Sequence, residues 1–240
     1  MDRMIYLSMS GAKAAMQRQD SLANNLANSS TVGFRAELQA FRSASIPGDG
    51  LNTRAYAVES TIGYKSDPGP IATTGRNLDV AMQGNAWLSV QGLDGTQAYT
   101  RAGSLNVSSD GTLVTSGGLQ VLGDGGPIQV PANSEINIGQ DGTVSASING
   151  RSTQVGRIKL VTPERPMTRG EDGLFRDPNG DLPADTNARL TDGALEGSNV
   201  SPVENMVAMI TAARQFEAQM KMLQSAEANE KASAQLLSLN

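Results

Sequence analysis

Carboxylates are the plentiful reactive side chains of this sequence, because cysteine and histidine are both absent. Without them the chain has no thiol nucleophile, no imidazole base and none of the common soft metal ligands. Many aspartates and two asparagines directly precede a glycine, a dipeptide that tolerates positive φ and is typical of hairpin turns. In the middle of the chain, over about residues 75–195, these dipeptides are Asp94-Gly95, Asp110-Gly111, Asp124-Gly125, Asp141-Gly142, Asp172-Gly173, Asp192-Gly193, Asn149-Gly150 and Asn179-Gly180. A turn explains these residues without any catalytic role.

Two kinds of carboxylate site are alternatives to that interpretation. A pair of carboxylates could hydrolyse a glycosidic bond, which makes a cell-wall hydrolase one alternative. Residues 177–181 resemble a calcium-binding loop, but the glycine stands at the wrong position and no matching glutamate follows. A solvated turn explains that segment better. We therefore expect no enzyme activity, no metal site and no cofactor.

The charge and hydropathy patterns narrow the choice of partners. The formal net charge is −5 and no long run carries one sign, whereas nucleic-acid binding needs a clustered basic face. No apolar stretch reaches the length of about 18 residues that spans a bilayer. The first residues also lack the uncharged apolar core of a signal peptide. We expect no nucleic-acid partner, no direct membrane insertion, and either a cytoplasmic location or export without signal cleavage.

The N-terminal segment has the periodicity of a helix over about residues 3–30. Its candidate packing positions alternate in steps of four and three, which gives a narrow seam as in a coiled coil. They are Ile5, Met9, Ala12, Met16, Gln19, Ala23 and Leu26. Asp2 can cap the first turn, and Gly33 lies where the helix has to end.

The C-terminal segment predicts a second helix over about residues 201–237. It begins with SPVE at residues 201–204, which places serine at the N-cap, proline at N1 and glutamate at N3, as in a capping box. The seam continues in the same spacing through Met206, Met209, Ala213, Phe216, Met220 and Leu223. Both helices are rich in Ala, Ser, Gln and Asn, and a single helix of that composition is only marginally stable in water.

Between the helices the sequence predicts antiparallel β structure, because alternating apolar and polar segments separate the glycine turns. The predicted fold class is α+β: discontinuous N- and C-terminal helices that pair and flank a central antiparallel all-β domain. The predicted boundaries are 1–35 for the N-terminal helix, 36–74 for an extended connector, 75–195 for the β domain and 196–240 for the C-terminal helix. The connector is rich in Pro and Gly and has room for one irregular hairpin.

The two ends complement each other in charge. Residues 1–45 carry five cationic and three anionic side chains, and residues 195–240 carry three cationic and five anionic ones. The ends can therefore pair with each other and with copies of themselves, and heterologous contacts repeated from copy to copy build an open helical array. The alternative is an ordinary two-helix hairpin that caps the sheet and has no role in assembly.

Three segments carry a resemblance to a known family. ANNLANSSTVGFR at residues 23–35 resembles the N-terminal signature of flagellar rod and hook proteins. LEGSNVSPVE at residues 195–204 resembles the C-terminal signature of that family, and the segment from LDVA at 78–81 through YTRAG at 99–103 resembles its central signature. The opening Met1-Asp2 with Ile5-Tyr6 is similar to proximal-rod members. Ala86-Trp87-Leu88 stands where distal-rod and hook relatives usually have Gly-Phe-Phe, and this departure favours the proximal rod over the distal rod. A distal-rod subunit is the alternative within the family.

The resemblance implies a structural subunit of the flagellar basal-body rod in the periplasm. Such a subunit polymerises through its terminal helices into the drive shaft that transmits torque. The partners it implies are copies of the chain itself, neighbouring rod proteins and the flagellar type III export apparatus, which passes subunits unfolded. A secreted β-rich adhesin or cell-wall-binding module is the alternative from a different class.

The residues expected at the assembly interface come from the helical seams and the N-terminal signature. They are Ile5, Met9, Met16, Asn24, Asn25, Leu26, Asn28, Phe34, Met206, Ile210, Phe216, Met220 and Leu223. Burying such side chains against neighbours would offset the entropy of ordering the ends. We therefore expect ends that become ordered on assembly around a rigid centre.

Overall fold

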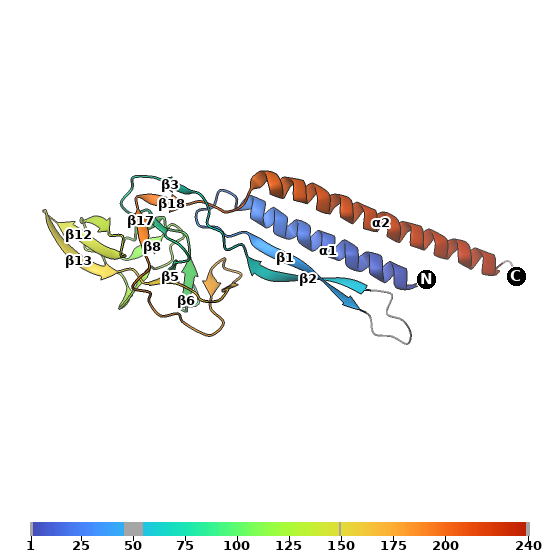
Figure 1. Ribbon diagram of the computed structural model, residues 1–240, viewed down its shortest axis with the longest axis horizontal. Coiled ribbons are helices and arrows are strands. Elements are labelled where there is room, and N and C mark those ends of the chain that lie inside the picture. The colour runs from blue at the N-terminus through green and yellow to red at the C-terminus, as the bar shows by residue number, and fades with distance from the viewer. Residues whose placement is uncertain (1, 46–54, 149, 239–240) are drawn as a thin grey trace. The chain divides into compact units, whose positions relative to one another are not determined.

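The computed structural model describes residues 2–45, 55–148 and 150–238, and Figure 1 shows their order along the chain. One helix, α1 (Asp2–Ala27), precedes the strands and a second, α2 (Pro202–Ser238), follows them, which confirms the predicted α+β class. The chain forms two compact units. The helical unit draws on Met1–Ser29, Glu37–Ile62 and Val200–Asn240, and the β-rich unit on Ser30–Ala36 and Gly63–Asn199.

Within the helical unit α1 and α2 lie side by side, as predicted (Figure 1). The Glu204 amide donates to Ser201 Oγ at 3.4 Å, which supports the predicted serine cap of α2. α1 ends at Ala27, three residues earlier than predicted. Both the backbone amide and the side-chain amide of Asn28 donate to the Asn24 carbonyl, at 3.1 and 3.0 Å. Asparagine side chains compete for backbone partners in this way, and the helix therefore closes early.

Small side chains fill the surface through which α1 meets α2. A Cβ added to Gly11 would lie 2.9 Å from the Gln219 side chain, so this face of α1 packs closely on α2. Small residues also occupy buried positions of both helices, namely Ser8, Ala12, Ala14 and Ala15 on α1 and Ala212 on α2. Met9 and Met16 of the predicted seam are exposed instead. Small residues let the two backbones approach, and this leaves the bulkier methionines on the outside.

The strands are short. They are β1 (Glu37–Ser45), β2 (Ala55–Tyr64), β3 (Ile71–Thr73), β4 (Val80–Met82), β5 (Trp87–Gln91), β6 (Gln97–Thr100), β7 (Leu105–Val107), β8 (Leu113–Thr115), β9 (Leu122–Gly123), β10 (Gly126–Pro127), β11 (Glu135–Ile138), β12 (Thr143–Ile148), β13 (Arg151–Arg157), β14 (Leu160–Val161), β15 (Thr168–Arg169), β16 (Phe175–Arg176), β17 (Leu190–Asp192) and β18 (Ala194–Glu196). β1 and β2 pair with each other inside the stretch predicted as a connector, whose residues 46–54 lie outside the described residues.

The β-rich unit consists of several small antiparallel sheets. The largest has the order β14-β5-β6-β16-β15, and β11-β12-β13 form a second. The last two strands return to the beginning of the unit, because β17 pairs with β4 and β18 pairs with β3. An aliphatic core that includes Leu88, Leu113 and Leu190 lies beside a smaller cluster formed around Trp87 and Phe175. Residues from both ends of the unit are therefore needed to complete its packing.

Four of the predicted glycine turns share one hydrogen-bonding pattern, and they begin at Gly92, Ser108, Gly139 and Gly170. In each, the first amide donates to the fifth carbonyl, and the aspartate at the third position accepts from the amide or hydroxyl of the fifth residue. The glycine after the aspartate has a φ between 77 and 84°, the left-handed region that glycine adopts without a steric cost. At Asp124-Gly125 the positive φ falls on Gly126, because the chain offers a second glycine there.

The turn aspartates make the stability of this protein sensitive to acid. The Thr96 and Thr143 hydroxyls hold the pKa of the Asp94 and Asp141 carboxyls below the usual value, because they hydrogen-bond to the charged form. A carboxyl with a depressed folded pKa contributes stability above its unfolded pKa of about 3.9 and loses it as the pH falls through the folded pKa. We therefore expect the urea midpoint to stay level near neutral pH and to fall below about pH 4.

The D94N/D141N variant tests that explanation. Asparagine keeps an acceptor oxygen for the threonine amide but does not titrate, so we expect a shallower loss of stability below about pH 4 than in the unchanged chain. Urea melts followed by circular dichroism between about pH 2.5 and 7 provide the comparison. Acid slopes that coincide for the two chains would contradict this account.

Candidate functional site

The residues predicted for an assembly interface differ in exposure. Six are exposed, namely Met9, Met16, Asn24, Met206, Ile210 and Met220. Five are half-buried, namely Ile5, Leu26, Asn28, Phe216 and Leu223. Asn25 and Phe34 are buried, and Phe34 lies against Arg169, whose guanidinium carbon is 4.5 Å from the ring centroid. Those two side chains are engaged within the subunit, whereas the exposed methionines and Ile210 are available to a partner.

The exposed apolar side chains form two stripes on the helical unit. The α2 stripe consists of Val203, Met206, Val207 and Ile210, each between 48 and 69 % exposed. Their spacing of i, i+3, i+4 and i+7 places them on one face of the helix. The α1 stripe consists of Tyr6, Met9 and Met16, each between 54 and 60 % exposed and likewise on one helical face. Contiguous exposed apolar surface of this kind marks interaction sites on soluble proteins.

Asn25 fastens α1 to the first strand of the same unit. Its side-chain amide donates to the Glu37 carbonyl at 3.1 Å, and its Oδ1 accepts from the Glu37 amide at 2.8 Å. The asparagine side chain therefore satisfies both backbone groups of the residue that begins β1. Ser21 Oγ adds a 3.1 Å hydrogen bond to the Glu37 carboxylate. This part of the asparagine-rich signature holds α1 and β1 together.

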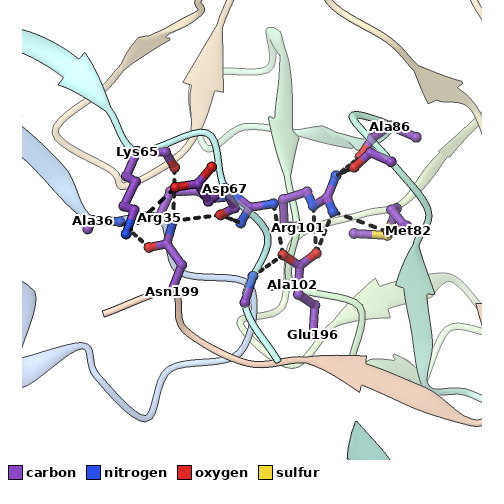
Figure 2. Close-up of polar contacts among 12 residues, drawn as sticks. Arg35, Ala36, Lys65, Asp67, Met82, Ala86, Arg101, Ala102, Glu196 and Asn199 are labelled. Atoms are coloured by element: carbon purple, nitrogen blue, oxygen red, sulfur yellow. Dashed lines mark hydrogen bonds and ion pairs between the residues drawn. The ribbon is translucent and has the colours of Figure 1, made fainter. Parts of the chain in front are cut away.

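The β-rich unit contains a buried cluster of three charged side chains, Arg35, Arg101 and Glu196, which we call the clasp (Figure 2). Each is at most 2 % exposed. Arg35 Nη2 lies 2.8 Å from Glu196 Oε1, and Arg101 Nη2 and Nε lie 2.6 and 2.8 Å from Glu196 Oε2. Such an arrangement is stable only when the partners are complete, because a buried charge without a counter-ion is strongly unfavourable.

Backbone groups bind most of the remaining polar atoms of the clasp, although Arg35 Nε is buried without a hydrogen-bond partner. Arg101 donates to the carbonyls of Met82, Gly84 and Ala86 at 3.1, 2.9 and 2.6 Å, and Arg35 Nη1 donates to the Asp67 carbonyl. The Gly69 amide donates to Glu196 Oε1 at 2.9 Å. Burial lowers the pKa of the Arg35 guanidinium, and the neighbouring Glu196 carboxylate opposes that shift. Carbonyl oxygens thus surround two cations that share one carboxylate.

Asn199 joins the same chain segments beside the clasp (Figure 2). Its Oδ1 accepts from the Ala36 amide at 2.7 Å, and its Nδ2 donates to the Lys65 and Asp67 carbonyls at 2.9 and 2.8 Å. One side chain therefore links residues near 36, near 66 and near 199. These are the places where the chain passes between the β-rich unit and the residues of the helical unit.

Gly33 is required next to the clasp for a steric reason. Its φ is +69°, and a Cβ built on it would lie 2.2 Å from the backbone carbonyl carbon of Arg101. Its amide donates to the Glu196 carbonyl at 2.8 Å. Gly33 was predicted only as the residue where the first helix has to end. It also allows its own segment to approach the segments of Arg101 and Glu196.

The clasp residues were not among the predicted site residues. Each belongs to one of the three signature segments, with Arg35 at the end of the first, Arg101 in the central one and Glu196 in the last. The available signal was that these two cations and one anion stand in segments whose other residues are mostly small or apolar. The residue pattern of one segment does not show which charged side chains pair with those of another segment about 160 residues away. The cluster was therefore not predicted from the sequence.

The geometry of the clasp leaves little room for chemistry. Both carboxylate oxygens of Glu196 already accept two hydrogen bonds each, from Arg35, Gly69 and Arg101. A carboxylate so engaged is a structural anion and has no free position for an incoming proton. Among the described residues no group of three acidic side chains is placed to hold a metal ion. None of the helices in the described part of the chain has the length and apolar character needed to span a bilayer.

Three family models match consecutive parts of the chain. The model described as "Flagella basal body rod protein" matches residues 5–35, "Flagellar hook protein FlgE/F/G D1 domain" matches 81–146, and "Flagellar basal body rod FlgEFG protein C-terminal" matches 191–236. Each matched part contains one member of the clasp.

Full-length relatives agree with these matches. The chain is 45 % identical to the flagellar basal-body rod protein FlgF of Salmonella typhimurium and 43 % identical to that of Escherichia coli, each over 100 % of both chains. It is also 32 % identical to the flagellar basal-body rod protein FlgG of Bacillus subtilis, over 94 % of this chain and 95 % of that one.

The role of Asn25 can be tested by substitution with alanine. The N25A variant leaves the Glu37 amide and carbonyl without their side-chain partner, and we expect a loss of about 1–3 kcal/mol in the free energy of unfolding. Urea unfolding followed by circular dichroism at 222 nm measures it. The matched control is N24A, a neighbouring exposed asparagine, for which we expect a change within about 0.5 kcal/mol. Similar losses in both variants would contradict the proposed clamp.

Proposed function

This chain belongs to the flagellar basal-body rod and hook protein family, and from that premise we propose that its helical unit is the part through which subunits join. The chain is a structural subunit of the proximal rod of the flagellar basal body, in the periplasm. The distal-rod alternative is not favoured, because identity to the FlgF relatives of Salmonella typhimurium and Escherichia coli is well above the 32 % shared with the Bacillus subtilis FlgG. Neither is an adhesin favoured, since the rod proteins match over the full length of the chain.

Membership of the rod family implies assembly with other rod and hook proteins. The observation that supports the helical unit as the joining surface is the exposure of its two apolar stripes. Fully burying a Val, Met or Ile side chain contributes roughly 1.5–3 kcal/mol. Burial of several such side chains on each helix favours joining of the subunits, and it offsets part of the cost of ordering the ends and fixing the subunits together.

The proposed contact is heterologous, with the stripe of one helix meeting a different surface of the next subunit. Apart from the buried Arg35 and Glu196, residues 1–45 carry four cationic and three anionic side chains and residues 195–240 carry three cationic and four anionic ones. The charges of the two segments are therefore weakly complementary and favour contact between unlike surfaces. A heterologous contact that does not close into a ring extends into an open helical array, which is the form of a rod. The segments 1–35 and 196–240 would then act as one assembly domain, and residues 75–195 as a β domain carried along with it.

Export in an unfolded state through the flagellar type III apparatus belongs to the same proposal. Its support is the family membership, together with helices of Ala, Ser, Gln and Asn that are marginal when isolated. No catalytic step is needed for this role. The family is one of structural rod proteins, and the saturated Glu196 carboxylate supports a purely structural subunit.

The M206K/I210K variant tests the joining surface. Both side chains are exposed, so the isolated subunit should fold as before, whereas each contact would have to bury a lysine in place of an apolar side chain. We expect incorporation into basal bodies, and swimming in soft agar, to fall at least about tenfold. Quantifying the subunit in purified basal bodies provides the measurement.

The control for that experiment is L93K. Leu93 is 90 % exposed in a turn of the β-rich unit, so it is an exposed apolar side chain like those at the test positions but lies in the other unit. We expect L93K to assemble normally. If M206K/I210K subunits enter basal bodies as well as L93K subunits do, the helical unit is not the joining surface.

A further inference from the structure

We propose that Glu196 is a folding lock: the β-rich unit cannot complete its fold until the segment 190–199 has docked. The proposal concerns the order of folding and does not depend on the rod function. It rests on the position of the clasp residues along the chain and on the lack of any other acidic partner for them among the described contacts.

The first observation is the charge balance of the clasp. Arg35 and Arg101 are 2 and 1 % exposed, and Glu196 is the carboxylate that the described ion pairs give to both. The remaining acceptors of the two guanidiniums are neutral carbonyls, of Asp67 for Arg35 and of the β4–β5 region for Arg101. Without Glu196 the unit would bury two like charges, which is strongly disfavoured.

The second observation is that the same segment completes the packing elsewhere in the unit. β17 pairs with β4 and brings in Leu190, which is fully buried, and β18 pairs with β3. Asn199 then closes the hydrogen bonds to Ala36, Lys65 and Asp67. The last ten residues of the unit are therefore needed for three things. They complete the core, they neutralise the two arginines, and they supply the Asn199 hydrogen bonds.

A consequence follows for a chain that appears from its N-terminus first. While residues 30–189 are available and 190–199 are not, the two arginines have no counter-ion and must stay in water. The strands that bury them cannot close around them. The β-rich unit therefore stays unfolded until nearly 200 residues, including the segment 190–199, are free to fold.

Pulse-labelling hydrogen exchange during refolding of the full chain from urea tests the order directly. The amides of β5 and β6 are followed beside those of residues 190–199. We expect both groups to gain protection in one phase with the same rate constant. Full protection of β5 and β6 before residues 190–199 become protected would overturn the proposal.

Variants separate the charge from the packing. E196Q keeps the shape and the acceptor for Gly69 but removes the counter-ion, and we expect its folding equilibrium constant to fall about a hundredfold or more. The matched control is D79N, because Asp79 is also buried in this unit but its partner Arg76 is half-exposed, with a 3.1 Å ion pair. We expect the folding equilibrium constant of D79N to fall about tenfold or less, because water also solvates the half-exposed Arg76 side chain.

The neutral variant R35M/R101M/E196M makes the proposal falsifiable even if E196Q does not fold. Replacing all three charges with apolar side chains of similar length removes the uncompensated charge, although it also removes the arginine hydrogen bonds to backbone carbonyls. Apolar replacement of a buried ion cluster is often close to neutral for stability. We expect this variant to fold within about tenfold of the unchanged chain, and therefore better than E196Q. An E196Q that folds as well as D79N would overturn the lock. So would a neutral variant that is as unfolded as E196Q, because packing and not charge would then decide.

Discussion

The fold depends on one carboxylate, that of Glu196, which lies between the guanidiniums of Arg35 and Arg101 in the interior of the β-rich unit. A buried ion cluster adds little stability by itself, but it allows only one arrangement of the segments that supply it. Here those segments come from the beginning, the middle and the end of the chain. Gly33, which lets the first segment approach the second, and Asn199, which ties the crossings together, serve the same junction.

The two units divide the work of the molecule. The β-rich unit buries many of its large apolar side chains internally, around Trp87, Leu88 and Leu190. The helical unit pairs its helices through small side chains and leaves Met206, Ile210 and their neighbours in water. Because small residues occupy most of the buried positions of the two helices, several bulky apolar side chains stay exposed for other contacts. This division suits a rod subunit, because the β-rich unit is stable by itself and the helical unit keeps apolar surface for contacts with neighbouring subunits.

Local chemistry allowed much of this architecture to be predicted. The serine cap of α2, the two helices and the Asp-Gly turns depend on residues within a few positions of one another. Three features did not follow from the sequence. The buried positions of α1 include Ala14 and Ala15, which the predicted seam left out, because alanine carries a weak periodic signal beside methionine. Asn25 hydrogen-bonds to the backbone of Glu37 in β1, and a pattern of side-chain types does not indicate such a bond. The clasp pairs residues that are far apart in the sequence, and at such separations the sequence does not show which of the many charged residues pair.

The central claim is that the β-rich unit is complete in the single subunit whereas the helical unit is completed by neighbours. Hydrogen exchange of the subunit as a dilute monomer and in assembled rods tests it most directly. We expect slow exchange of β5, β6 and β12 in both states. The α1 and α2 amides should exchange faster than these strands in the monomer and slow at least about a hundredfold in the rod. Strong protection of both helices already in the dilute monomer would contradict it.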